Sequence, residues 1–255
     1  MGTRKPRKRF IPGIYNFCDR WCERCRFTAR CRIFDMEERD PGSPEEQDLR
    51  NAAFWKKLGR IFARTKRMLL RHAKKQGIEL DLDAIKQESK RTKPCRRQTP
   101  LTLEAERYAK AVAAYMKEKQ PDFLEKRDTL EGLANADIPG TDPLGQAVRI
   151  NDALEVVLWY HLFIVVKLSR ALKLQGDEGD ALDDEEFERW DANVSAKLAL
   201  LAIDRSIQAW AALRKDFPEH DDTVLDMLLS LGRLRRESEA AFPVARAFKR
   251  PGFEE

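Results

Sequence analysis

Residues 153–166 read ALEVVLWYHLFIVV, and this apolar run decides the fold class. Apart from Glu155 and His161 every side chain in it is apolar, so a helix through the run is hydrophobic on nearly all faces. Helices of that kind belong in the centre of a bundle. The run is too short to span a bilayer. The sequence therefore predicts a soluble helical bundle built around a helix over residues 144–174.

Proline and glycine signals place further helices on both sides of this one. Thr99-Pro100 opens a helix to about residue 119, Pro121 opens another to 135, and IPGTDP at 138–143 is a loop. Two more helices are expected over residues 185–215 and 221–241, with Phe217-Pro218 between them. No period-two pattern indicates a strand, so we expect an all-α protein.

Four of the five cysteines lie in one short segment, YNFCDRWCERCRFTARCRIF, at residues 15–34. They are Cys18, Cys22, Cys25 and Cys31, with the spacing C-x3-C-x2-C-x5-C. If the segment is helical, the first three thiols share one face and the fourth folds back to them. Four thiolates this close can hold a tetrahedral zinc ion or an iron–sulfur cluster. The sequence therefore predicts a metal site with these four ligands.

Arginines crowd the same segment, where they would offset the negative charge of a thiolate cluster. They stand at positions 20, 24, 26, 30 and 32. Two other interpretations compete with metal binding. The cysteines could be small buried hydrophobic residues, or they could form disulfides. The odd cysteine count and the lack of a secretory signal argue against disulfides and indicate a reducing, cytoplasmic setting.

The choice of metal stays open between a [4Fe–4S] cluster and zinc. Zinc sites usually combine two separated C-x2-C pairs, whereas three close thiols plus one more is nearer to cluster ligation. The first three cysteines also resemble the C-x3-C-x2-C motif of radical-SAM enzymes. Arg24 stands where those enzymes usually have an aromatic residue, and no βαβ pattern follows to build their barrel. Cys95 lies in a basic loop and is expected to be a spare thiol.

The string YNFCDRWCERC at residues 15–25 also resembles one in a family of uncharacterised bacterial proteins. This resemblance is confined to the N-terminal segment. It implies no activity, so it adds nothing to the interpretation of the residues.

Charge is distributed unevenly along the chain. Residues 1–100 carry 27 Lys and Arg against 13 Asp and Glu, whereas residues 101–255 carry 21 against 30. Ser43-Pro44 begins a helix predicted to run to Gln76, and residues 50–75 contain ten Lys or Arg and no acid. Its apolar stripe could pack on the acidic half of the chain. Alternatively, residues 1–9 and 50–75 could bind nucleic acid or an acidic protein surface.

Polar residues within the predicted bundle give a third hypothesis, an enzyme with its active site near Glu155, His161 and Asp204. A di-iron carboxylate site is not favoured, because no Glu-x-x-His pair is present. The simpler interpretation is that Asp152 or Asp204 pairs with Arg149, with Arg205 or with the basic helix, and that His161 is a hydrogen-bonded core residue. His72 and His220 are expected at the surface. No sequence feature assigns a substrate, a reaction or an oligomeric state.

The predicted organisation is a helical bundle preceded by a four-cysteine metal-binding segment and a long basic amphipathic helix. The expected parts are a basic tail at 1–13, the metal-binding segment at 14–40, a basic helical region at 41–98, the bundle at 99–241 and an irregular tail at 242–255.

Overall fold

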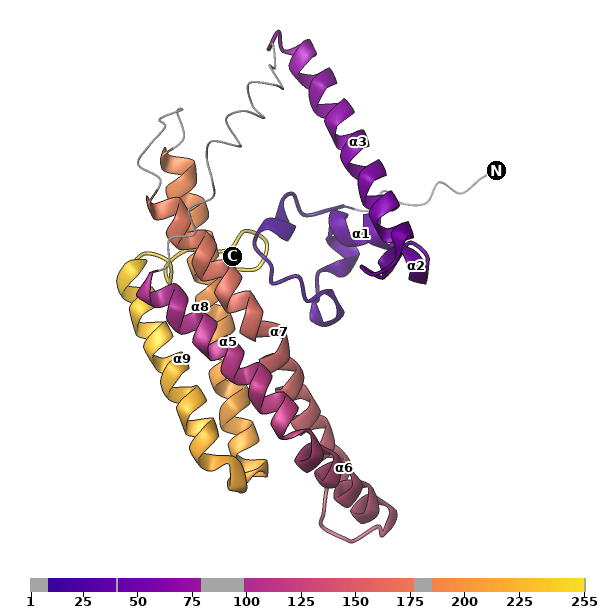
Figure 1. The fold of residues 1–255 in the computed structure, drawn as a ribbon, viewed down its shortest axis with the longest axis vertical. Coiled ribbons are helices and arrows are strands. Elements are labelled where there is room, and N and C mark those ends of the chain that lie inside the picture. The colour runs from indigo at the N-terminus through magenta and orange to yellow at the C-terminus, as the bar shows by residue number, and fades with distance from the viewer. Residues whose placement is uncertain (1–8, 40, 79–98, 177–184, 255) are drawn as a thin grey trace. The chain divides into compact units, whose positions relative to one another are not determined.

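The computed structural model describes residues 9–39, 41–78, 99–176 and 185–254. These ranges contain eight α-helices and no strand, which confirms the predicted all-α class (Figure 1). The chain divides into two compact units. The N-terminal unit comprises residues 1–15 and 21–96, and the bundle unit comprises residues 16–20 and 97–255.

The bundle unit is built from four long helices that lie side by side (Figure 1). They are α5 (Pro100–Glu118), α7 (Pro143–Gly176), α8 (Glu185–Asp216) and α9 (Asp221–Ala241). Helix α6 (Gln120–Asn135) packs against α7, and a short 3-10 helix, η4 (Pro218–His220), leads into α9. The most extensive packing is between α7 and α8. The predicted helices thus exist, with ends within one or two residues of the expected positions.

The apolar run of α7 forms the core with only part of its circumference. Val157, Ile164 and Leu168 are fully buried, as their spacing of seven and four residues on one helix face requires. Leu162 and Val166, from the same run, are exposed by 59% and 62%. The prediction of a central helix covered on all sides is therefore wrong in one respect, because three neighbouring helices do not enclose a fourth completely.

Helix starts follow the side-chain chemistry that the sequence indicated. The Thr99 hydroxyl accepts the Thr102 amide at 3.2 Å ahead of α5, with Pro100 at the first helical position. Asp142 accepts the Gly145 amide at 2.9 Å at the start of α7. Such caps satisfy amides that have no partner within the helix.

The N-terminal unit contains α1 (Arg32–Arg39), α2 (Pro44–Gln47) and α3 (Ala52–Lys75). The predicted helix start at Ser43-Pro44 is present, with Ser43 and Glu46 forming a capping box, but the prediction of a single helix to Gln76 is wrong. After α2, Asp48 accepts the Arg50 amide at 2.9 Å, and Asn51 then caps α3 by accepting the Ala53 amide at 3.0 Å. These local bonds compete with helical ones and break the chain into two helices. The rest of the predicted basic helical region, residues 79–98 with Cys95, lies outside the described residues.

Candidate metal centre

The cysteine segment is not a helix but a series of tight turns, so the conditional prediction that three thiols share a helix face is wrong. A 3-10 turn, η2, covers Cys22–Arg24, and another, η3, covers Thr28–Arg30. Cys25 follows η2 in an extended conformation, with its amide donating to the Cys22 carbonyl at 3.1 Å.

The two turns are a structural repeat that the sequence analysis overlooked. WCERCR at residues 21–26 and FTARCR at 27–32 share the pattern aromatic-x-x-Arg-Cys-Arg. Cys25 and Cys31 occupy the same position, with φ, ψ of −88°, 119° and −96°, 121° respectively. The Cys31 amide donates to the Thr28 carbonyl at 3.1 Å, matching the bond at Cys25. Alignment of the two six-residue strings would have revealed this equivalence.

One sulfur of the segment accepts a backbone hydrogen bond. The Phe27 amide donates to Cys25 Sγ at 3.4 Å. Amide donors of this kind stabilise a thiolate, and hydrogen bonds to sulfur also tune iron–sulfur clusters. Two guanidinium groups lie over aromatic rings nearby, Arg24 over Trp21 at 4.2 Å and Arg26 over Phe27 at 4.7 Å. The segment therefore places two guanidinium groups on its aromatic rings and has an N–H donor for sulfur.

All four candidate ligands are partly buried thiols, and none of them is joined in a disulfide. Within the described residues, however, no three His, Cys, Asp or Glu side chains are gathered closely enough to hold a metal ion. Cys22, Cys25 and Cys31 belong to the N-terminal unit, and Cys18 belongs to the short piece of chain counted with the bundle unit. The four-ligand site thus stays a prediction.

The backbone on both sides of Cys18 is held by the bundle unit. Before it, the Phe17 ring is buried against Val194 and Leu198 of α8. Trp190 meets the same ring edge-on at 5.5 Å, and Phe248 of the C-terminal tail stacks on it at 6.2 Å. Aromatic contacts of this kind supply large buried apolar area. Phe17 therefore anchors this segment.

After Cys18, Asp19 provides a polar anchor. Its Oδ2 accepts the Tyr160 hydroxyl and Arg205 Nη1, each at 2.6 Å, and its carbonyl accepts Trp159 Nε1 at 3.2 Å. Burial raises the pKa of Tyr160 and the Asp19 charge adds to the rise, so this phenol stays a hydrogen-bond donor. Lys167 of α7 lies in the same region, and its pKa is lowered, first by burial and then by Arg170.

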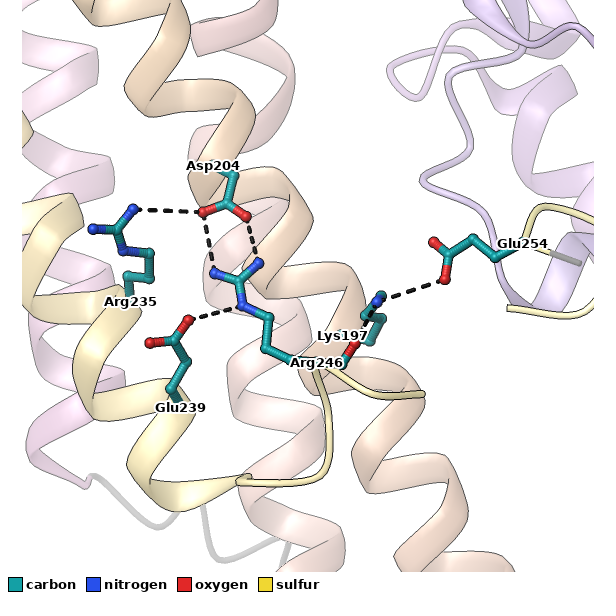
Figure 2. Close-up of polar contacts among 6 residues, drawn as sticks. All are labelled: Lys197, Asp204, Arg235, Glu239, Arg246 and Glu254. Atoms are coloured by element: carbon teal, nitrogen blue, oxygen red, sulfur yellow. Dashed lines mark hydrogen bonds and ion pairs between the residues drawn. The ribbon is translucent and has the colours of Figure 1, made fainter. Parts of the chain in front are cut away.

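The structure gives Asp204 a partner that the sequence analysis did not consider. Arg246 of the C-terminal tail donates to it from Nη1 at 2.5 Å and Nη2 at 3.2 Å, and Arg235 lies 3.9 Å away (Figure 2). Arg246 also donates to Glu239 at 2.8 Å. The suggested pairing of Asp204 with Arg149, Arg205 or the basic helix is thus replaced, because Arg149 pairs with Asp142 and Arg205 with Asp19.

This network holds the C-terminal tail on the bundle. Lys197 donates to the Arg246 carbonyl at 2.8 Å and lies 3.5 Å from the Glu254 carboxylate (Figure 2). Phe242 and Ala245 are buried in the same region. Residues 242–254 contain turns rather than a helix, but they are firmly packed. Asp204 accordingly has a structural role.

Glu155 and His161 likewise have local partners of their own. Asn151 donates to Glu155 at 2.9 Å, and His161 Nδ1 lies 2.7 Å from the Leu158 carbonyl. Asp204 is engaged by the tail, so each of the three residues has a polar partner outside this group. His161 is only half-buried, which differs from the expected core position.

A hydrogen-bonded chain elsewhere in the bundle unit was missed, because His220 was expected at the surface. Its side chain is buried, with 4% of the residue exposed. Nδ1 lies 2.8 Å from the Tyr115 hydroxyl and Nε2 lies 2.9 Å from Asp122 Oδ2. The ring also stacks on Phe217 at 5.3 Å. This chain ties α5, α6 and η4 together, and open clefts of about 360 and 470 Å³ lie beside it. Sequence spacing gives no signal for contacts across 98 or 105 residues.

Comparison with known proteins assigns no relative to this chain: no protein-family model, no curated protein and no solved structure matches it. Among the described helices, none is both long enough and apolar enough to cross a membrane.

Proposed function

We propose that this protein binds metal through Cys18, Cys22, Cys25 and Cys31, as either a [4Fe–4S] cluster or a zinc ion. The observation that carries the proposal is the equivalence of Cys25 and Cys31 in the two repeated turns, together with the Phe27 amide that donates to Cys25 Sγ at 3.4 Å. A turn that presents sulfur beside a backbone donor suits a thiolate better than a packed, neutral thiol.

The other two ligands, Cys18 and Cys22, are proposed from their spacing along the sequence. Cys22 lies at the start of the turn that ends before Cys25, which gives the C-x2-C pair common to zinc and iron–sulfur sites. Cys18 is the fourth ligand by proximity along the chain, and its neighbours Phe17 and Asp19 are fixed on the bundle. A bound metal would supply the folding free energy that such a short, turn-rich segment otherwise lacks.

The metal determines the role. A cluster would make the protein a redox sensor or an electron carrier, since a cluster's potential depends on hydrogen bonds to its sulfurs and on solvent exposure. A zinc ion would make the segment a structural clip with no redox chemistry. The surrounding cations support either one, because both leave excess negative charge on the thiolates.

Substitution of single cysteines tests the ligand set. Cys25→Ser and Cys31→Ser should each lose most of the metal from anaerobically purified protein, because serine is a poor ligand for these metals. Cys95→Ser is the matched control, which changes a thiol outside the cluster and should keep the full metal content. Equal metal content in all three variants and the unchanged protein would contradict the proposal.

The nucleic-acid or acidic-surface hypothesis for residues 1–9 and 50–75 has one supporting observation. Helix α3 is formed along most of this range, from Ala52 to Lys75, and carries no acidic residue. Residues 1–8 lie outside the described residues, so the tail supports this hypothesis only through the positive charge of its sequence. If this binding rested on phosphate contacts alone, its affinity would fall steeply as the salt concentration rises. The apolar face of the same helix favours a different partner.

A further inference from the structure

Helix α3 separates apolar and basic side chains almost completely. At about 100° per residue, seven of its eight large apolar side chains fall within an arc of about 140°, and the eighth, Leu70, lies outside it. This apolar arc comprises Phe54, Trp55, Leu58, Ile61, Phe62, Met68 and Leu69. The opposite arc holds Lys and Arg at positions 56, 57, 60, 64, 67, 71, 74 and 75. The ninth cation of the helix, Lys66, lies at the border of the apolar arc beside Trp55.

Most of the apolar arc is exposed. Trp55, Phe62 and Leu69 are exposed by 59%, 63% and 60%, and Ile61 and Met68 by 50% and 58%. Ala73 is the single buried residue among those described in α3. A run of large exposed side chains along one helix face is unusual for a protein surface and marks an interaction site.

Within the described part of the chain, an acidic residue of α2 pairs with cations at one end of the basic arc. Glu46 of α2 engages two of its cations, Lys57 at 3.4 Å and Arg60 at 2.9 Å. Both are near the N-terminal end of α3. Beyond them the helix continues to Lys75 with no acid of its own to offset the cations.

A nucleic acid would neutralise the basic arc but would leave Trp55, Phe62 and Leu69 in water. An anionic phospholipid surface satisfies both arcs at once, because the acyl region accepts the apolar side chains and the headgroups accept the cations. Lysines beside the apolar arc fit this arrangement, since their long side chains reach back to the headgroup level. The length of α3, about 36 Å, is that of a helix lying in the interface plane.

We propose that α3 binds anionic phospholipid surfaces, lying in the interface with Trp55, Ile61, Phe62, Met68 and Leu69 among the acyl chains. The inference is independent of the metal proposed above. It adds an interaction surface that attaches the protein to a membrane without spanning it.

The test is flotation of the full-length protein with vesicles of phosphatidylcholine alone or mixed equally with phosphatidylglycerol. We expect binding to the mixed vesicles only, weakened by added salt. Phe62→Glu and Ala63→Glu form a matched pair, because they add the same charge at neighbouring positions on opposite faces. Ala63→Glu should weaken binding about fivefold, which is the expected effect of one charge near an anionic membrane surface. Phe62→Glu should weaken it more than about 50-fold, because an apolar contact is lost as well.

Each other outcome would overturn the proposal. No flotation with anionic vesicles, or equal flotation with neutral ones, excludes the predicted surface. Equal weakening by the two substitutions, combined with tighter binding to a DNA duplex, would assign α3 to nucleic acid. If Phe62→Glu lowers the thermal unfolding midpoint while Ala63→Glu does not, the apolar arc is covered by protein and is not a lipid surface.

Discussion

Replacement of Phe17 by alanine tests how the segment that precedes the cysteine turns is held. The ring is 5% exposed and contacts Trp190, Phe248 and Val194. Removing about 150 Å² of buried apolar surface at about 25 cal/mol per Å² costs about 4 kcal/mol. Because residues 16–20 are a surface segment that can relax into part of the space, we expect a net loss of about 3 kcal/mol.

Urea unfolding followed by far-ultraviolet circular dichroism measures this loss. With a slope of about 3 kcal/mol per molar urea, the midpoint should fall by about 1 M. Leu162→Ala in the same unit is the control, since that side chain is 59% exposed and its removal should change the unfolding free energy by less than about 0.5 kcal/mol. A change of less than about 1 kcal/mol in Phe17→Ala, against the cavity cost expected for a buried ring, would refute the anchoring role.

Two further predictions concern long-range polar contacts. His220→Phe keeps the aromatic packing but leaves the buried Tyr115 hydroxyl without its hydrogen-bond partner, which should cost about 2 kcal/mol in urea unfolding. Asp122→Asn, at a more exposed position, should cost less than half as much, and equal costs would contradict this reasoning. For Glu254, burial opposes ionisation, but Arg250 outweighs it and the pKa is lowered. Its folded-state pKa is therefore below the unfolded one, so its contribution to stability is present above about pH 4.3 and is lost as pH falls through the folded value. The unfolding free energies of wild type and Glu254→Gln should accordingly converge in acid, and a constant difference between pH 7 and pH 3 would contradict the assignment.

The helices were predictable because their signals are local. The apolar run from Ala153 identified α7, and Thr99-Pro100 and Ser43-Pro44 marked helix starts that the structure confirms. The break before α3 was missed because Asp48 and Asn51 had been counted as helical, whereas their side chains bind nearby amides. Polar residues of this kind favour caps over helix interiors.

Contacts between distant residues were not predictable from one sequence. Eight arginines lie within 42 residues of Asp204 along the chain, and periodicity alone does not choose Arg246. His220 follows a proline-containing loop, and its burial depends on how α5 and α6 meet η4. For the proposed metal site, spacing identified the four cysteines, and alignment of residues 21–26 with 27–32 could have revealed the repeat, but the turn geometry came from the structure.

The most direct test of the central claim is metal and sulfide analysis of the wild-type protein, purified without oxygen and without added metal. We expect either about four iron and four sulfide per chain with a brown absorbance, or about one zinc per chain in a colourless protein. The thiols of Cys18, Cys22, Cys25 and Cys31 should then react with a thiol reagent only after the metal is removed. A metal-free protein whose native cysteines all react at once would contradict the claim.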